Sequence, residues 1–169
     1  MRHIALSLAL AIVAPLAGAG CLPVLGTVRL TPDAACGVAT VPGMEGQPFI
    51  GECFKTVLSL GGLLPAYGYS GVTTEPLTGL LPPNAVAASP ATLQGGRNVL
   101  TARTTFSLGG TRFYAAEVVI DSGNGIVTEQ SVITGTDGKG LFRNATGNFA
   151  ILGNSINETA QIRGQICTP

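Results

Sequence analysis

The stretch NVLTARTTFSLGGTRFYAAEVVI, residues 98–120, gives the clearest indication of fold class because apolar and polar side chains alternate along it. A period of two residues is typical of a β-strand with one buried face. The glycine pair at 109–110 favours a tight hairpin turn between the two halves. The stretch therefore predicts two antiparallel strands, 98–108 and 111–120. One face of the first strand carries Leu100, Ala102, Thr104, Phe106 and Leu108.

The same pattern of strands and tight turns continues towards the C-terminus. Three further strands are expected over residues 126–134, 141–152 and 155–167. Gly-rich turns separate them, among them DSGNG (121–125) and TDGKG (136–140). With two strand candidates upstream, this spacing predicts an all-β fold, a small antiparallel up-and-down β-barrel of about eight strands. A sandwich is the alternative.

The N-terminal half is rich in proline and glycine, with prolines recurring from Pro23 to Pro90. Because proline lacks an amide donor, long helices and central strands are not expected there. Short strands are predicted over 24–30 and 53–60, and a long loop over about 61–97. We expect residues 20–169 to form a single barrel domain.

The first residues have the pattern of an export signal. Arg2 and the sole histidine, His3, precede an apolar run and a small-residue site that ends at Ala19. We expect residues 1–19 to be a signal peptide cleaved after Ala19, and the protein to be secreted or periplasmic. The run is shorter than the roughly 18–20 residues of a membrane span. The alternative is a lipid anchor at Cys21, but the usual bulky aliphatic residue three positions before that cysteine is missing.

Charge and residue inventory exclude several classes of protein. The chain of 169 residues has nine basic and nine acidic residues, so no basic excess exists for binding nucleic acid. Cleavage after residue 19 would remove Arg2 and His3, leaving eight basic against nine acidic residues and no histidine. A Ser-His-Asp or Cys-His catalytic system is then impossible. We expect no metal site and no cofactor, since the cysteines form no C-x-x-C pair.

Four cysteines, Cys21, Cys36, Cys53 and Cys167, predict two disulfides in an exported chain. Four cysteines allow three pairings. We favour Cys21 with Cys36 and Cys53 with Cys167, because the second bridge would tie an early strand to the last one.

Two glutamates fall on apolar faces of predicted strands and are the catalytic candidates. Glu117 alternates with Phe113, Ala115 and Val119, and Glu158 alternates with Ile156, Ala160 and Ile162. If these faces line the barrel, desolvation would raise the pKa of both carboxyls and suit them to acid–base work. Tyr114 and Arg112 are candidate partners, and so is Arg103 if the polar side of its strand faces inward. The alternative is that each glutamate reaches water or pairs with an arginine across strands.

Residues 98–167 resemble the dirigent and allene oxide cyclase barrel superfamily, through VITGTDGKGLFRNATGNFAILG (132–153) and the preceding AEVVIDSGNGIVTEQS. The resemblance implies an eight-stranded barrel with a cavity, often trimeric. Phe142, Arg143 and Ala145 in the motif serve turns and packing. The first half of the chain departs from the superfamily, with a proline-rich loop in place of recognisable early strands, and it offers no motif on which to place the superfamily's catalytic residues.

Three functions follow from these observations. The first is a secreted, disulfide-stabilised barrel that binds a small apolar ligand or is structural. The second is a dirigent-like or cyclase-like enzyme without cofactor, guiding ring closure or coupling of an apolar intermediate. The third is a surface or matrix assembly protein. Asn144 and Asn157 match the N-glycosylation pattern, which matters only in a eukaryote. The sequence does not establish a reaction, and a role without turnover is favoured.

Overall fold

The computed structural model describes residues 20–45, 49–61, 63, 65–73, 98–122 and 126–169. These residues form eight strands and one short 3-10 helix. The elements are β1 (Gly20–Pro32), η1 (Gly37–Thr40), β2 (Phe49–Leu60), β3 (Ala66–Thr73), β4 (Asn98–Leu108), β5 (Thr111–Asp121), β6 (Val127–Thr136), β7 (Thr146–Leu152) and β8 (Ala160–Thr168).

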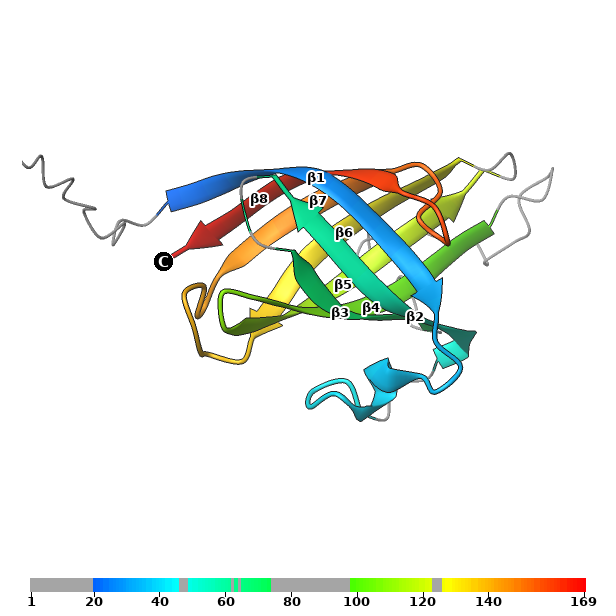
Figure 1. Cartoon of the computed structure of the whole chain (residues 1–169), viewed down its shortest axis with the longest axis horizontal. Coiled ribbons are helices and arrows are strands. Elements are labelled where there is room, and N and C mark those ends of the chain that lie inside the picture. The colour runs from blue at the N-terminus through cyan, green and yellow to red at the C-terminus, as the bar shows by residue number, and fades with distance from the viewer. Residues whose placement is uncertain (1–19, 46–48, 62, 64, 74–97, 123–125) are drawn as a thin grey trace, which may run out of the picture.

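The strands form a closed up-and-down barrel, in which each strand pairs antiparallel with the next along the chain. The first and last strands complete the barrel, with register pairs running from Gly20 opposite Thr168 to Val28 opposite Ala160. Figure 1 shows β1 lying beside β8, with the C-terminus next to the start of β1. Closure satisfies the backbone groups that would otherwise be exposed at two sheet edges. The predicted all-β, eight-stranded barrel is confirmed.

One end of the barrel is filled by aromatic side chains. Phe106 and Phe113 stack with ring centroids 4.7 Å apart, and Phe149 meets Phe106 edge-on at 6.2 Å. Phe142, from the turn between β6 and β7, packs against Phe113 and covers this end. Burial of these rings supplies much of the driving force for folding.

The predicted disulfide pairing is wrong. Cys21 is bonded to Cys167, and Cys36 to Cys53. Barrel closure explains the first bridge, because it places the first strand beside the last, with Cys21 directly opposite Cys167. Strand spacing alone carries no information on this closing register.

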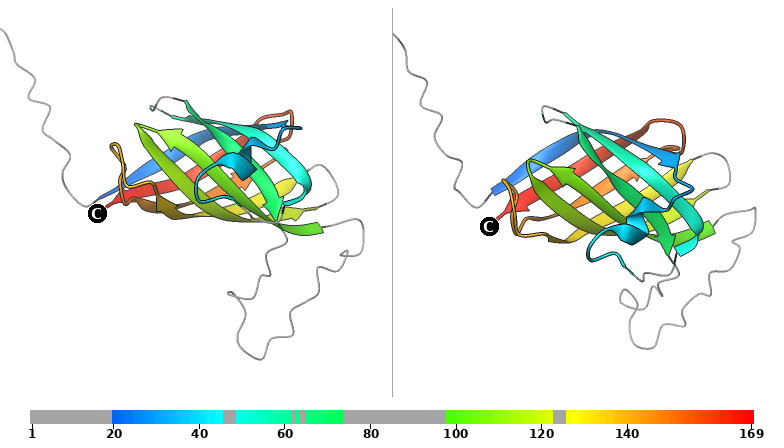
Figure 2. Two further views of the ribbon diagram at one scale, coloured as in Figure 1. Left: turned by 90° about the horizontal axis from the view of Figure 1, so that it is seen from below. Right: turned by 60° about the horizontal axis from the view of Figure 1, so that its bottom comes forward.

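The second bridge holds a small structure outside the barrel. Val38, Val41 and Met44 are buried against Tyr69 of β3 and Tyr114 of β5. Figure 2 shows the segment containing η1 on the outer side of the barrel wall. The Cys36–Cys53 bridge ties this segment, which we call the outer cap (residues 33–45), to β2.

Several predicted boundaries are wrong. Residues 66–73 form a strand rather than part of a loop. Their inward positions carry small residues such as Gly68 and Ser70 instead of the branched residues typical of strands. The strand expected over 141–152 begins only at Thr146, and the one expected over 155–167 begins at Ala160. The signal peptide (1–19) and the rest of the predicted loop (74–97) lie outside the described residues.

Candidate functional site

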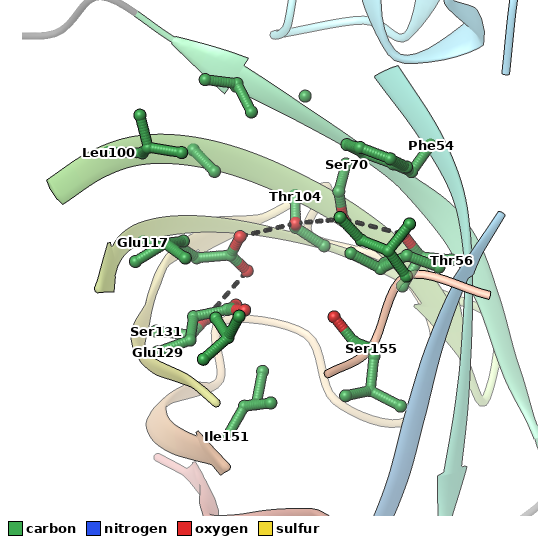
Figure 3. Close-up of a pocket in the computed structure, with 18 of the residues that line it drawn as sticks. Phe54, Thr56, Ser70, Leu100, Thr104, Glu117, Glu129, Ser131, Ile151 and Ser155 are labelled. Carbon is green, nitrogen blue, oxygen red and sulfur yellow. Dashed lines mark hydrogen bonds between the residues drawn. The ribbon is translucent and has the colours of Figure 1, made fainter. Parts of the chain in front are cut away.

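The end of the barrel opposite the aromatic cluster encloses a cavity of about 360 Å³. Most of its wall is aliphatic or aromatic, with side chains from β1, β2, β4, β7 and β8. The rim includes Leu100 and Ile156, which are 37% and 39% exposed, so the mouth is also apolar. A strip of polar side chains, which we call the polar strip, runs along part of the wall (Figure 3). It consists of Thr56, Ser70, Thr104, Glu117, Glu129 and Ser131.

Glu117 lies on this polar strip and is only 8% exposed. Its strand β5 points Phe113, Ala115 and Glu117 inward, as the alternation predicts. Thr104 of β4 donates a hydrogen bond to Oε2 at 2.9 Å, and Ser131 of β6 donates to Oε1 at 3.2 Å. Each carboxylate oxygen therefore has a hydroxyl donor from a neighbouring strand.

The hydrogen bonds continue away from Glu117 through two further hydroxyl groups. Thr104 Oγ1 is bonded to Ser70 Oγ of β3 at 2.5 Å, and Ser70 Oγ to Thr56 Oγ1 of β2 at 2.7 Å (Figure 3). Each hydroxyl has one proton to donate. Because Thr104 donates to Glu117, Ser70 must donate to Thr104, and Thr56 to Ser70. We call Thr56, Ser70, Thr104 and Ser131 the hydroxyl row; with Glu117 it crosses five consecutive strands, from β2 to β6.

A second carboxyl, Glu129 of β6, adjoins Glu117 and is 7% exposed. Strand register places Val119 opposite Glu129 and Glu117 opposite Ser131, so the two glutamates are diagonal neighbours. The two carboxyl groups are close enough for each to influence the pKa of the other.

Burial raises the pKa of Glu117 to about 7, although hydrogen bonds from Thr104, Ser131 and Glu129 and the charge of Arg103 act in the opposite direction. Burial also raises the pKa of Glu129 well above its ordinary value, and the negative charge of Glu117 and the hydrogen bond between them raise it further. The two groups titrate as a pair. Both carboxyl groups therefore keep a proton to a higher pH than an ordinary glutamate does.

Three of the four candidate residues are not at this site. Glu158 is exposed in the connection between β7 and β8, because Asn157 adopts a left-handed conformation with φ 60° and the strand does not begin until Ala160. Tyr114 and Arg112 alternate with the inward residues of β5 and so lie on the outer face, where Tyr114 packs under the outer cap. The prediction that they partner a cavity carboxylate is wrong. Arg103 also lies on an outward position, in β4.

Glu129 is the residue that the sequence interpretation missed. The signal was the hairpin between residues 111–120 and 126–134, since pairing its strands places residue 129 diagonally opposite residue 117. Alternation within 126–134 gives no such signal, because its inward positions include both Glu129 and Ser131.

The described residues contain no group of three or more His, Cys, Asp and Glu side chains that could hold a metal ion. No helix in the described part of the chain is long and apolar enough to cross a membrane. Asn144 and Asn157 are both exposed. Comparison with known proteins finds no matching family model, and no curated protein or solved structure with significant similarity to the chain.

Proposed function

We propose that this chain is an exported protein whose barrel binds a small molecule with a largely apolar body and one polar group. The observation that carries the proposal is the cavity of about 360 Å³, with a mostly apolar wall and a strip of polar groups that includes Glu117. Ligand sites in proteins typically have roughly 300–1,000 Å³, mostly apolar walls and a few placed polar groups. Two disulfides support the export part of the proposal, because such bonds persist in oxidising compartments.

Energetics also favour a binding role over a purely structural one. A cavity in place of packed side chains and two desolvated carboxyl groups each destabilise a folded protein. A barrel that served only as a scaffold would be more stable with apolar side chains at Glu117 and Glu129. Groups that reduce stability in this way are concentrated at functional sites.

Binding is tested by filling the cavity. Ala102 lines the cavity beside Glu117, whereas Ala116 lies on the outer face of the neighbouring strand. We expect the neutral fluorescent probe N-phenyl-1-naphthylamine to bind the wild-type chain and Ala116→Leu, and to bind Ala102→Leu at least about tenfold more weakly. Circular dichroism would establish that each variant is folded. Equal binding by the two variants, or no binding by the wild type, would overturn the proposal.

A second candidate function is favoured by the carboxyl pair. A carboxyl with a pKa of about 7 beside a second carboxyl whose pKa is also raised is suited to acid–base work near neutral pH. The resemblance of residues 98–167 to the dirigent and allene oxide cyclase superfamily suggests ring closure or coupling of an apolar intermediate. Mass spectrometry of ligands recovered after incubation with the protein distinguishes binding alone from turnover. A ligand recovered unchanged supports binding alone, and an isomerised or coupled product that Glu117→Gln does not form supports turnover.

A further inference from the structure

The charges that line the cavity are all of one sign. Glu52 and Asp121 lie towards the mouth, and Glu117 and Glu129 lie deeper in the polar strip. Among the described residues that line the cavity, none is Lys, Arg or His. The cation that acts on Glu117 is Arg103, on the outer face of β4, and its influence is the smallest of those on that carboxyl. The deeper pair therefore faces the cavity without an opposite charge from the lining.

The hydrogen bonds inside the wall reinforce this asymmetry. Thr104 and Ser131 donate to Glu117, and Glu129 is its diagonal neighbour on β6. These bonds fix the orientation of the carboxyl groups without neutralising the charge of the ionised pair. A ligand atom reaching the pair meets acceptor oxygens that carry a net negative charge. A positively charged donor is the best partner for such acceptors, because charge-assisted hydrogen bonds are about twice as strong as neutral ones.

We propose that the cavity takes an apolar amine, whose ammonium group binds to Glu117 and Glu129 while its hydrocarbon part lies against the apolar wall. This inference rests on the proposed binding function and specifies the polar group of the ligand. An ammonium group has three N–H donors and no acceptor, which matches two carboxyl groups that present oxygens. A ligand carboxylate would be repelled by the same pair, and a neutral alcohol would make a hydrogen bond without the gain from charge.

The experiment compares three ligands of equal chain length on the full chain. Octylamine, octanol and octanoate compete with N-phenyl-1-naphthylamine at pH 8, where Glu117 is mostly ionised and the amine is still charged. We expect octylamine to bind at least about tenfold more tightly than octanol, a difference of about 1.4 kcal/mol, and octanoate to bind most weakly. The preference for the amine should shrink as the pH falls to 5.5, because Glu117 gains a proton and the pair loses its charge.

Matched variants show which carboxyl groups cause the preference for the amine over the alcohol. In Glu117→Gln/Glu129→Gln the preference of amine over alcohol should fall below about twofold, whereas Glu158→Gln, which removes an exposed carboxylate, should retain it. If octanol binds wild type as tightly as octylamine, the amine inference is overturned while the binding function stands. If neither the probe nor any octyl compound binds, the binding function itself fails. The wild-type comparison decides the question even if the double variant does not fold.

Discussion

Replacing Glu117 with glutamine should change how the stability of the barrel depends on pH. Burial raises the pKa of Glu117 from 4.5 to about 7. One unit of pKa corresponds to about 1.4 kcal/mol, so ionisation of this carboxyl opposes folding by about 3 kcal/mol. The folded state binds the proton more tightly than the unfolded state does. Its contribution to stability is therefore fully present below pH 4.5, declines as the pH rises, and is lost above pH 7.

The assay is urea unfolding at pH 4.5 and pH 8, with both disulfides intact. Between these values the wild-type free energy of unfolding should fall by about 3 kcal/mol more than that of Glu117→Gln. Removing the charge of Glu117 also lowers the pKa of Glu129 towards its ordinary value, since that charge contributes to raising it. This effect has the same sign and enlarges the difference between the proteins. Carboxyl groups elsewhere are the same in wild type and Glu117→Gln, so their contributions cancel in the difference between the two proteins.

Glu158→Gln is the control, because it removes an exposed carboxylate from the connection before β8. Its stability should follow that of the wild type across the whole range. The reasoning would be refuted if wild type and Glu117→Gln differed by the same amount at pH 4.5 and pH 8. That result would mean that water reaches Glu117 and stabilises its charge.

Three further predictions concern the barrel itself. Cys21→Ser/Cys167→Ser removes a disulfide with a sequence separation of 146, and should lower the free energy of unfolding by about 5 kcal/mol in urea. Removing the shorter Cys36–Cys53 disulfide should lower it by about 3 kcal/mol, and equal losses from the two changes would contradict this. Gly68→Ala should destabilise by at least about 2 kcal/mol, because its Cβ would lie 1.8 Å from the Thr105 carbonyl oxygen. Gly135→Ala, with no atom within 4 Å of its Cβ, should be neutral, and similar melting temperatures for the two glycine variants would refute the close approach. Thr105→Val should stabilise by about 1 kcal/mol, because the Thr105 hydroxyl is buried without a hydrogen-bond partner among the described residues; a loss in thermal unfolding would count against this.

Local sequence was sufficient for the strands whose inward faces are regularly apolar or whose turns are marked by glycine. The β4–β5 hairpin has the predicted bounds to within one residue, because alternation and the Gly109–Gly110 turn both specify it. Strand β3 was missed because its inward positions are small. Gly68 is required there by the close approach of the neighbouring backbone, and in a sequence such a residue is typical of a loop.

Glu117 and Glu158 show why alternation identifies a face only where the strand is continuous. Both glutamates stand between apolar neighbours two residues away, so they are indistinguishable by pattern. At Glu117 an unbroken strand makes the pattern meaningful. At Glu158 no continuous strand exists, because Asn157 adopts a left-handed conformation. Ile156 belongs to the connection before β8, and Ala160 to β8 itself. Asparagine tolerates that conformation better than most residues, so Asn157 is the sequence feature that indicates a break in the strand.

The position of the cavity depends on register, which single strands do not encode. Phe106 and Phe113 are direct register partners, and with Phe149 they fill one level of the barrel. Nearer the mouth, Ala102 is the register partner of Glu117, and Ser70 is the register partner of Thr104, so small side chains meet where large ones would be needed to fill the interior. Each strand taken alone shows merely a few polar residues among apolar ones. Pairing of β2 to β6 brings these polar residues together in a hydrogen-bonded row, and closure into a barrel encloses the cavity beside it. The same closure desolvates Glu117 and Glu129 together, so the cavity and its perturbed carboxyl pair are two consequences of one register.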